Sequence, residues 1–386
     1  MPFSAAARRF LVTSLLLVAA TAANAESPEV ATSRLPDGAY QPQVVLDEAD
    51  RLHMIYAKGD PAAADVYYVR SEAEGKFGAP IRVNSQPGSV LPVGTVRGAH
   101  LAVGGDGRAH VVWMGSEHAE PKGPEGATPM LYTRLNDAGE AFEPQRNVLQ
   151  HAVPLDGGGT VAADDAGRVY VAWHAGGESE TERRIWIARS EDGGQSFDRE
   201  TAVSPPGRGV CPCCGMTGVA DGNSVWLAYR AATDSVDRDI YLLGSNNTGR
   251  TFETSTRADR WHLDACPMST LDLLHDSNQT WLAWETEQQV YVARFDHDGK
   301  MIGEPVSPPG EPDGRKHPRL ALDAEGRILL VWTEGTGWAR GGSVGWQVYD
   351  SSLQPIHEAQ GRVDDLPAWS FATPFVRPDG EFEIVY

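Results

Sequence analysis

The sequence predicts an all-β fold, a β-propeller of four-stranded antiparallel blades, from three observations. A short apolar run that ends in Trp or Tyr recurs seven times in the 386 residues. The 41 Gly and 26 Pro residues favour tight turns, and almost no segment has a sustained helical period. A period of about 50 residues built from short strands is typical of a radial array of blades. The repeated aromatics are Tyr56, Trp113, Trp173, Tyr229, Trp284, Trp332 and Tyr386.

Each repeat begins with a predicted β-hairpin. A first apolar run, such as residues 101–103, leads into an Asp/Gly turn, and a second run, such as 107–113, ends in the repeated aromatic. Residues 167–173, 326–332 and 380–386 have the same register as this second run. Two apolar runs joined by such a turn are typical of an antiparallel hairpin.

A third and a fourth strand are expected after each hairpin. Residues 65–70 and 184–189 are examples of the third, and residues 79–83 of the fourth. The seventh repeat, from about residue 371 to 386, supplies only a hairpin, to which residues 30–34 could add an outer strand that closes the ring. Counting repeats therefore predicts seven blades, the last of them incomplete.

The N-terminus has the features of an export signal. Arg8 and Arg9 precede an apolar run over residues 10–20, and Ala23 and Ala25 offer small residues for cleavage. We therefore expect a signal peptide over residues 1–25, one propeller domain over 26–386, and a periplasmic or secreted protein with no later membrane span. The formal net charge of −20 argues against a nucleic-acid partner.

Two segments share a turn pattern that links them to a known family. Their residues recur 55 positions apart and are Ser190, Asp192, Gly194, Ser196 and Phe197 in the first copy, and Ser245, Asn247, Gly249, Thr251 and Phe252 in the second. This pattern resembles the Asp box of sialidases and BNR-repeat proteins. Ser, Thr and Asp side chains can bond backbone amides in a tight turn, so the box is structural. The resemblance implies a sialidase-like propeller, with six blades as the alternative count.

The resemblance also implies candidate catalytic residues for a diverged exo-sialidase or another glycoside hydrolase. Sialidases hold a substrate carboxylate with arginines, and Arg97, Arg230 and Arg319 are the candidates for that role. Asp156 or Glu285 would then act as acid/base. The family's Arg-Ile-Pro signature is replaced by Pro80-Ile81-Arg82 on a predicted outer strand.

Aligning the repeats on their aromatic residue predicts a ligand site at the propeller axis. Gln43, His100, Thr160 and Arg319 fall at equivalent places near the start of the innermost strand. Different polar residues at equivalent positions could bind a small molecule or a glycan. Alternatively, they line a water-filled channel and satisfy one another's hydrogen bonds.

All four cysteines of the chain fall before the inner strands of two successive repeats. Cys211, Cys213 and Cys214 precede the fourth, and Cys266 precedes the fifth, so we expect them close together. Two disulfides are one explanation, and a bridge from Cys213 or Cys214 to Cys266 is more natural than one between the adjacent Cys213 and Cys214. The Cys-Pro-Cys-Cys segment followed by a later Cys-Pro also resembles a feature of an exported bacterial subgroup of sialidase-like proteins.

Two functional explanations of the cysteines remain open beside the disulfides. With Met216, Met268 or His262 as extra ligands, thiolates would form a soft donor set suited to copper or zinc. The Cys-x-x-Cys spacing of Cys211 and Cys214 suits thiol redox chemistry. The sequence thus favours an exported propeller that binds a ligand at its axial face beside the cysteines, with a hydrolase and a copper-binding or thiol-redox protein as alternatives.

Overall fold

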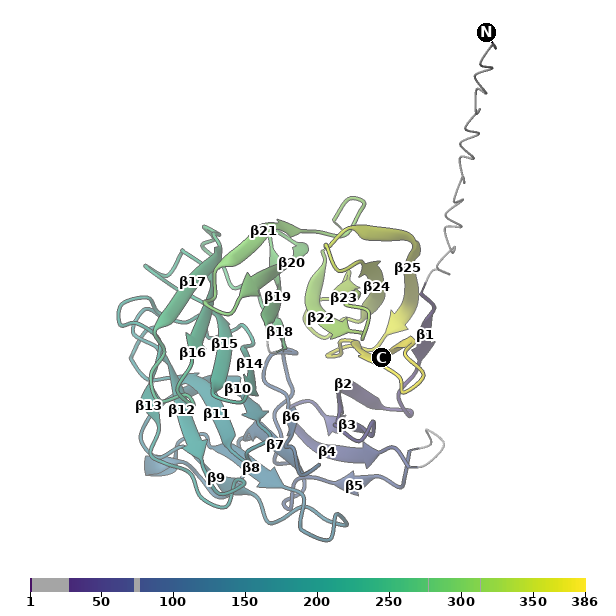
Figure 1. Ribbon diagram of the computed structural model, residues 1–386. Coiled ribbons are helices and arrows are strands. Elements are labelled where there is room, and N and C mark those ends of the chain that lie inside the picture. The colour runs from purple at the N-terminus through teal and green to yellow at the C-terminus, as the bar shows by residue number, and fades with distance from the viewer. Residues whose placement is uncertain (2–27, 73–76, 277, 313) are drawn as a thin grey trace.

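The computed structural model describes Met1 and residues 28–386 apart from 73–76, 277 and 313. The expected signal peptide lies almost wholly outside the described residues. Seven β-sheets follow one another around a central axis, in chain order (Figure 1). The prediction of an all-β propeller with seven blades is confirmed, and the six-bladed alternative is wrong.

Six blades have four antiparallel strands each, whose chain order is also their order from the axis outward. The first three blades consist of β2 (Ala39–Leu46), β3 (Leu52–Asp60), β4 (Ala63–Arg70) and β5 (Ile81–Arg82); β6 (His100–Val103), β7 (Ala109–Met114), β8 (Met130–Arg134) and β9 (Arg146–Asn147); and β10 (Leu155–Ala163), β11 (Val169–Ala175), β12 (Arg184–Ser190) and β13 (Thr201–Ala202). A short 3-10 turn, η2 (Pro124–Gly126), lies between β7 and β8.

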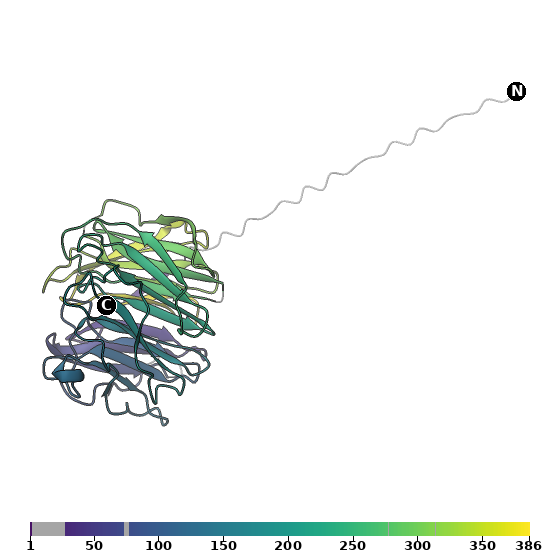
Figure 2. The same cartoon turned by 90° about the vertical axis from the view of Figure 1, so that its left-hand side faces the viewer.

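The next three blades repeat this pattern. They consist of β14 (Thr217–Asp221), β15 (Ser224–Arg230), β16 (Ile240–Ser245) and β17 (Thr254–Asp259); β18 (Asp272–His275), β19 (Gln279–Thr286), β20 (Gln289–Asp296) and β21 (Met301–Val306); and β22 (Lys316–Leu322), β23 (Ile328–Glu334), β24 (Gly342–Tyr349) and β25 (Pro355–Leu366). In side view the strands run between the two faces of the ring (Figure 2).

The seventh blade joins the two ends of the described chain. β26 (Thr373–Val376) and β27 (Phe382–Val385) form its hairpin, and β1 (Val30–Ser33) pairs in parallel with β27. Beyond the strand, the Leu35 amide donates to the Tyr386 carbonyl at 2.9 Å. The predicted closure of the ring by the N-terminal residues is therefore confirmed.

The repeated aromatics form the contacts between blades. Each lies in a hydrophobic cluster shared with the preceding blade: Trp113 packs with Ile55 of the first blade, and Trp173 packs with Met130 of the second. Tyr56 closes the series by packing with Phe375 of the seventh blade. Truncation of a buried Trp costs about 3–5 kcal/mol. Each blade therefore needs a large aromatic side chain at the same place in its contact with the preceding blade, and this need explains why the aromatic recurs once per blade in the sequence.

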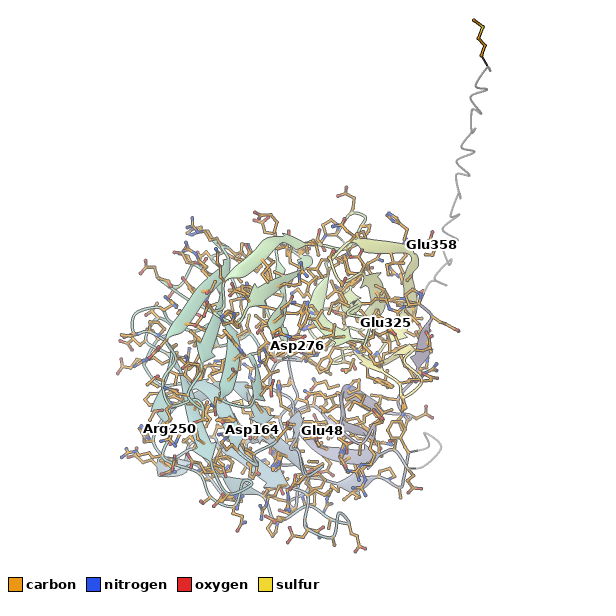
Figure 3. All side chains as sticks on the ribbon, viewed as in Figure 1. Glu48, Asp164, Arg250, Asp276, Glu325 and Glu358 are labelled. Atoms are coloured by element: carbon orange, nitrogen blue, oxygen red, sulfur yellow. A yellow bond between two sulfur atoms is a disulfide. The ribbon has the colours of Figure 1, made fainter. Side chains whose placement is uncertain are left out.

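The hairpins of the inner strands use a repeated carboxylate turn. Asp164 accepts hydrogen bonds at 3.0 Å from the amides of Ala166 and Arg168, and the Arg168 Nε donates to it at 2.7 Å. Asp47 and Asp323 make the same contacts with an arginine four residues later. Figure 3 shows four residues of these inner hairpin turns around the centre of the ring: Glu48, Asp164, Asp276 and Glu325. The opposite face carries the loops that enter the inner strands, among them those that contain the cysteines.

Candidate functional site

A ring of seven side chains lines the channel at the axis, one from each inner strand. Each of these residues pairs across its hairpin with the residue directly before the repeated aromatic, and together they line a cavity of about 370 Å³. The seven are Gln43, His100, Thr160, Thr217, Asp272, Arg319 and Thr373. The structure thus brings together the four residues that the sequence places at the axis.

The sequence alignment omits three members of this ring, for two reasons. Thr217 and Asp272 lie 12 residues before their aromatics rather than 13, because the hairpins of the fourth and fifth blades are one residue shorter. Thr373 keeps the usual spacing of 13, so the alignment itself could have found it. Aligning on hairpin length as well as on the aromatic would have recovered all three.

Most contacts of the ring tie one blade to the next. The Gln43 side chain donates to the Ala99 carbonyl at 2.7 Å and accepts from the Leu101 amide at 3.0 Å. Thr373 donates to the Pro42 carbonyl at 2.6 Å. Because these hydrogen bonds satisfy the polar groups within the protein, they support the view of the ring as a channel lining.

Charges in the ring are also internally compensated. Arg319 donates to the Leu271 carbonyl at 2.9 Å and lies 3.6 Å from a carboxylate oxygen of Asp272. Burial raises the pKa of Asp272, and the Arg319 charge opposes that rise. Burial, with the Arg319 charge adding to it, lowers the pKa of His100 to about 3, so this imidazole is neutral at physiological pH.

A second cavity, of about 120 Å³, lies on the face where the inner strands begin. Trp338 is 64% exposed there, and its ring meets that of Trp369 edge-on at 4.7 Å between centroids. Lys316 and Arg340 also line this cavity, and neither forms an ion pair within the described residues. The Lys316 ammonium donates to the Pro267 carbonyl at 2.6 Å. We refer to this cavity as the axial-face pocket.

Unusual backbone conformations gather around the axial-face pocket. Thr95, Met268, His317 and Trp369 line it, and all four have positive φ angles, between 50° and 66°. Such angles are uncommon for residues other than glycine, and strained backbone concentrates at functional sites. The concentration of four in one wall makes this pocket the strongest candidate site on the face.

Cys266 lines the same pocket, and the other three cysteines lie in the loop before β14, on the neighbouring fourth blade. Cys213 and Cys266 form a disulfide between the loops before β14 and β18, with 6.3 Å between their Cα atoms. Cys211 and Cys214 are buried free thiols 3.5 Å apart, and the Cys211 sulfur lies 3.4 Å from that of Cys213. The predicted convergence of the four cysteines is confirmed, with one disulfide rather than two.

The two free thiols share one hydrogen bond, which raises the pKa of one thiol and lowers that of the other. Burial opposes ionisation of Cys214, but the hydrogen bond from Cys211, the Arg230 charge and the Ser269 amide outweigh it and lower the pKa of Cys214 to about 6. The same hydrogen bond, reinforced by burial, raises the pKa of Cys211. The shared hydrogen bond therefore makes Cys214 the more acidic of the two thiols.

Sulfur atoms in this cluster are close enough to hold a metal ion. The Sγ atoms of Cys211, Cys213 and Cys214 all lie within 4.8 Å of one another, and because Cys213 is held in the disulfide, Cys211 and Cys214 are the two free thiols of this group. Of the suggested extra ligands, His262 is exposed and bonds Asp237 at 2.9 Å. Met216 is buried in the hydrophobic cluster between the third and fourth blades, and Met268 lines the axial-face pocket.

The candidate catalytic residues have separate partners. Arg97 lies 3.4 Å from Asp156, which is also 3.3 Å from Arg183. Arg230 is 1% exposed and lies 3.7 Å from Glu285, whose pKa is raised by burial. Asp156, with 31% of its side chain exposed, is the accessible carboxylate of the two candidates.

The two Asp-box segments form turns between the third and fourth strands of their blades. Asp192 accepts hydrogen bonds from the amide and the hydroxyl of Ser196, at 2.9 and 2.6 Å. In the second copy, the Thr251 amide donates to Asn247 at 3.0 Å, and the Asn247 amide group donates to the Thr251 hydroxyl at 2.7 Å. Both turns lie at the periphery of the ring, away from the axial-face pocket.

Comparisons with known proteins bear on the fold. No protein-family model matches the chain, and no curated protein matches it. The chain is similar to a solved PL25 ulvan lyase bound to a glucuronate and sulfated-rhamnose saccharide, with a TM-score of 0.53 and 12% identity over 88% of this chain and 87% of that one. It is also similar to a Penicillium chrysogenum α-L-arabinanase complexed with arabinobiose, with a TM-score of 0.50 and 12% identity over 82% and 94% of the two chains.

A Trypanosoma rangeli sialidase in complex with the inhibitor DANA is a third similar structure. Its TM-score is 0.50 at 10% identity, over 79% of this chain and 54% of that chain, so the protein spans about half the length of this sialidase. Among the described residues, no helix has the length and apolar character needed to cross a bilayer. At these identities the likeness concerns the fold, which is that of a sialidase-like β-propeller.

Proposed function

We propose that this protein is an exported propeller that binds an acidic saccharide in the axial-face pocket, beside the cysteine cluster. The observation that carries the proposal is the exposed Trp338, held against Trp369 at the edge of a pocket that also contains Lys316 and Arg340. An exposed Trp face is suited to stacking on a sugar ring.

The charge of the pocket favours an acidic sugar over a neutral one. The chain as a whole has a formal net charge of −20, yet the Lys316 and Arg340 side chains have no carboxylate partner within the described residues. Guanidinium and ammonium groups bind carboxylates and sulfates through charge-assisted hydrogen bonds. Cys266, Pro267 and Met268 complete one wall, which joins the pocket to the disulfide.

The export part of the proposal is supported by the disulfide and by the N-terminal sequence. A disulfide persists most readily in an oxidising compartment such as the periplasm or the extracellular space. The basic pair Arg8 and Arg9, followed by an apolar run, is typical of a signal peptide. Mass spectrometry of protein secreted by the native host should give an N-terminus near Glu26, and an intact N-terminus would contradict export.

Isothermal titration calorimetry with three saccharides tests the binding proposal. DANA and the glucuronate and sulfated-rhamnose saccharide supply negative charge, and arabinobiose is the neutral control. We expect saturable binding of at least one acidic probe and none of arabinobiose. Absence of heat with both acidic probes would contradict the proposal, and turnover of a fluorogenic sialoside that is lost in Arg97→Ala would favour the hydrolase instead.

A second candidate function is copper binding, which the free thiols Cys211 and Cys214 favour. Their sulfur atoms are 3.5 Å apart, and Cu(I) accepts a small number of soft ligands. Zinc usually takes four ligands, whereas two of the cysteines here are held in a disulfide. Anaerobic titration with Cu(I) against a chromogenic chelator should give one bound ion per chain, and no competition with the chelator would exclude this function.

A further inference from the structure

The four sulfur atoms form a continuous line from the surface to the interior. Cys266 is exposed on the axial face, Cys213 is half-buried, and Cys211 and Cys214 are buried. Cys266 is bonded to Cys213, Cys213 lies 3.4 Å from Cys211, and Cys211 lies 3.5 Å from Cys214. Each sulfur is thus in contact with the next.

This arrangement places the Cys211 sulfur, a potential nucleophile, in contact with the Cys213–Cys266 disulfide. Thiol–disulfide exchange requires a thiolate to approach one sulfur of a disulfide while the other sulfur leaves. Cys211 is in contact with Cys213, and the leaving sulfur would be that of the exposed Cys266. Cys214 is then in place to resolve the new bond, because it contacts Cys211.

We propose that the four cysteines form a thiol–disulfide relay, in which the bridge moves inward from Cys213–Cys266 to Cys211–Cys214 and leaves a reactive thiol at Cys266. The relay is a property of the sulfur atoms and does not depend on saccharide binding. Its accessible end lies in the wall of the axial-face pocket, where Cys266 can meet a disulfide of a small thiol.

The steps balance without an external oxidant. The Cys211 thiol loses its proton to water, and the Cys211 sulfur attacks Cys213, which breaks the Cys213–Cys266 bond and releases the Cys266 thiolate. Cys214 then gives its proton to Cys266 and attacks Cys211, which releases the Cys213 thiolate. The Cys213 thiolate takes up a proton from water, so the product has one disulfide and two thiols, as before.

The rearranged protein can reduce a small disulfide, for which oxidised glutathione is the probe. Cys266 loses its proton to water, and its thiolate attacks glutathione disulfide, forming a mixed disulfide and releasing one glutathione thiolate. Cys213 passes its proton to that thiolate, attacks the Cys266 sulfur and releases the second glutathione. The protein ends with both disulfides, and the two electrons that reduce the glutathione come from Cys211 and Cys214.

Mapping of alkylated cysteines tests the relay. The unreduced, folded protein is treated with iodoacetamide, quenched in acid and digested, and its peptides are identified by mass spectrometry. We expect carbamidomethyl groups on Cys213 and Cys266, with Cys211 and Cys214 joined in a disulfide. An intact Cys213–Cys266 disulfide, whether Cys211 and Cys214 are alkylated or all sites are unlabelled, would overturn the proposal.

Two serine variants separate the steps of the relay. In Cys211→Ser, alkylation of Cys266 should fall at least tenfold, because no nucleophile contacts Cys213. In Cys214→Ser, Cys266 should still be alkylated while a Cys211–Cys213 bridge accumulates. Equal labelling of Cys266 in Cys211→Ser and in the original protein would overturn the relay, and the wild-type map decides the question if either variant fails to fold.

The final check is the stoichiometry of glutathione reduction. The original protein should release two glutathione thiols per chain from oxidised glutathione and gain a second disulfide, whereas Cys211→Ser should show no net release. Release of two thiols per chain by Cys211→Ser would contradict delivery of electrons from the buried pair.

Discussion

At the scale of single residues, Arg319 shows how the axis of the propeller is held together. Its guanidinium joins the sixth blade to the Leu271 carbonyl and the Asp272 carboxylate of the fifth, and it is 9% exposed. Removing one partner of a buried ion pair leaves the other charge uncompensated. We therefore expect Arg319→Ala to lower the free energy of unfolding by about 3 kcal/mol, measured by urea denaturation.

A double variant is the control for Arg319. Arg319→Ala combined with Asp272→Asn removes the unpaired carboxylate and should recover part of the lost stability. Saccharide affinity should stay unchanged in both variants, because Arg319 lies in the channel and not in the axial-face pocket. A loss below 0.5 kcal/mol in the single variant, roughly the size of a surface effect, would show that the ion pair is not structural.

The polar residues of the candidate sites could be predicted from the sequence only where their distance from the repeated aromatic residue determines their position. Gln43, His100, Thr160 and Arg319 follow from the repeat, whereas Thr217 and Asp272 are displaced by one residue in shorter hairpins. The axial-face pocket could not be predicted in this way. Its Trp338 and Arg340 belong to a loop between β23 and β24, where no period fixes the position of a side chain.

At the scale of elements, the Asp-box turn offers a test in which the chain supplies its own control. Asp192 accepts from both polar hydrogens of Ser196, and its pKa is about 2. Burial opposes this lowering, but the hydrogen bonds from Ser196 and Ser190 outweigh it. Asp192→Ala should cost about 1 kcal/mol of stability, the net value of a hydrogen bond, as measured by urea denaturation.

Asp192→Asn should be nearly neutral, since Asn247 already makes equivalent contacts in the second box. Asp198→Ala, at an exposed carboxylate next to the same turn, is the matched control for loss of charge. If Asp192→Asn destabilised the protein as much as Asp192→Ala, the carboxylate charge rather than the turn geometry would be the stabilising feature.

The turns and hairpins were predictable because Gly, Asp and Ser have local conformational preferences. The sequence predicts that a third and a fourth strand follow each hairpin, but not their exact lengths. The outer strand expected over residues 79–83 is only two residues long in the structure, as β5. Only two residues of that strand pair with β4, at Tyr67 and Tyr68. Pairing at the outer edge depends on the neighbouring strand and not on the local sequence.

At the scale of the whole molecule, buried histidines should make the propeller sensitive to acid. Burial is the main cause that lowers the pKa of His110 and His317 to about 3 and that of His174 to about 4, from an ordinary value of 6.5. His100, with its pKa of about 3, belongs to the same group, so below pH 6.5 the unfolded chain binds up to four more protons than the folded one. Stability is fully present above pH 6.5 and falls by up to about 5 kcal/mol per pH unit as the pH approaches the folded values.

Urea denaturation between pH 7 and about pH 4.5 measures this slope. The raised pKa values of Asp272 and Glu285 act in the opposite direction and should offset part of the loss at the acid end. His174→Gln should make the slope shallower by about one proton, while the exposed His297→Gln should leave it unchanged. A stability that is flat between pH 6.5 and pH 5 would contradict the neutral, buried state of these histidines.

The number of blades followed from the sequence because the repeat extends over the whole chain. The incomplete seventh repeat needs a strand from elsewhere, and residues 30–34 are a segment close to the expected cleavage site that can supply it. The parallel direction of β1 relative to β27 could not be predicted, since it depends on how the chain enters the closed ring. A ligand was still less predictable, because a fold of this kind carries many functions.

Calorimetric titration of Trp338→Ala with the acidic saccharide that the original protein binds tests most directly whether the axial-face pocket is the binding site. Trp338 makes no side-chain hydrogen bond within the described residues, and a stacked contact on an aromatic face contributes about 0.5–1.5 kcal/mol beyond the area that it buries. We predict at least a tenfold loss of affinity in Trp338→Ala and none in Phe77→Ala, where the exposed aromatic lies outside the pocket. Equal affinity in the original protein and Trp338→Ala would contradict the assignment of the axial-face pocket as the binding site.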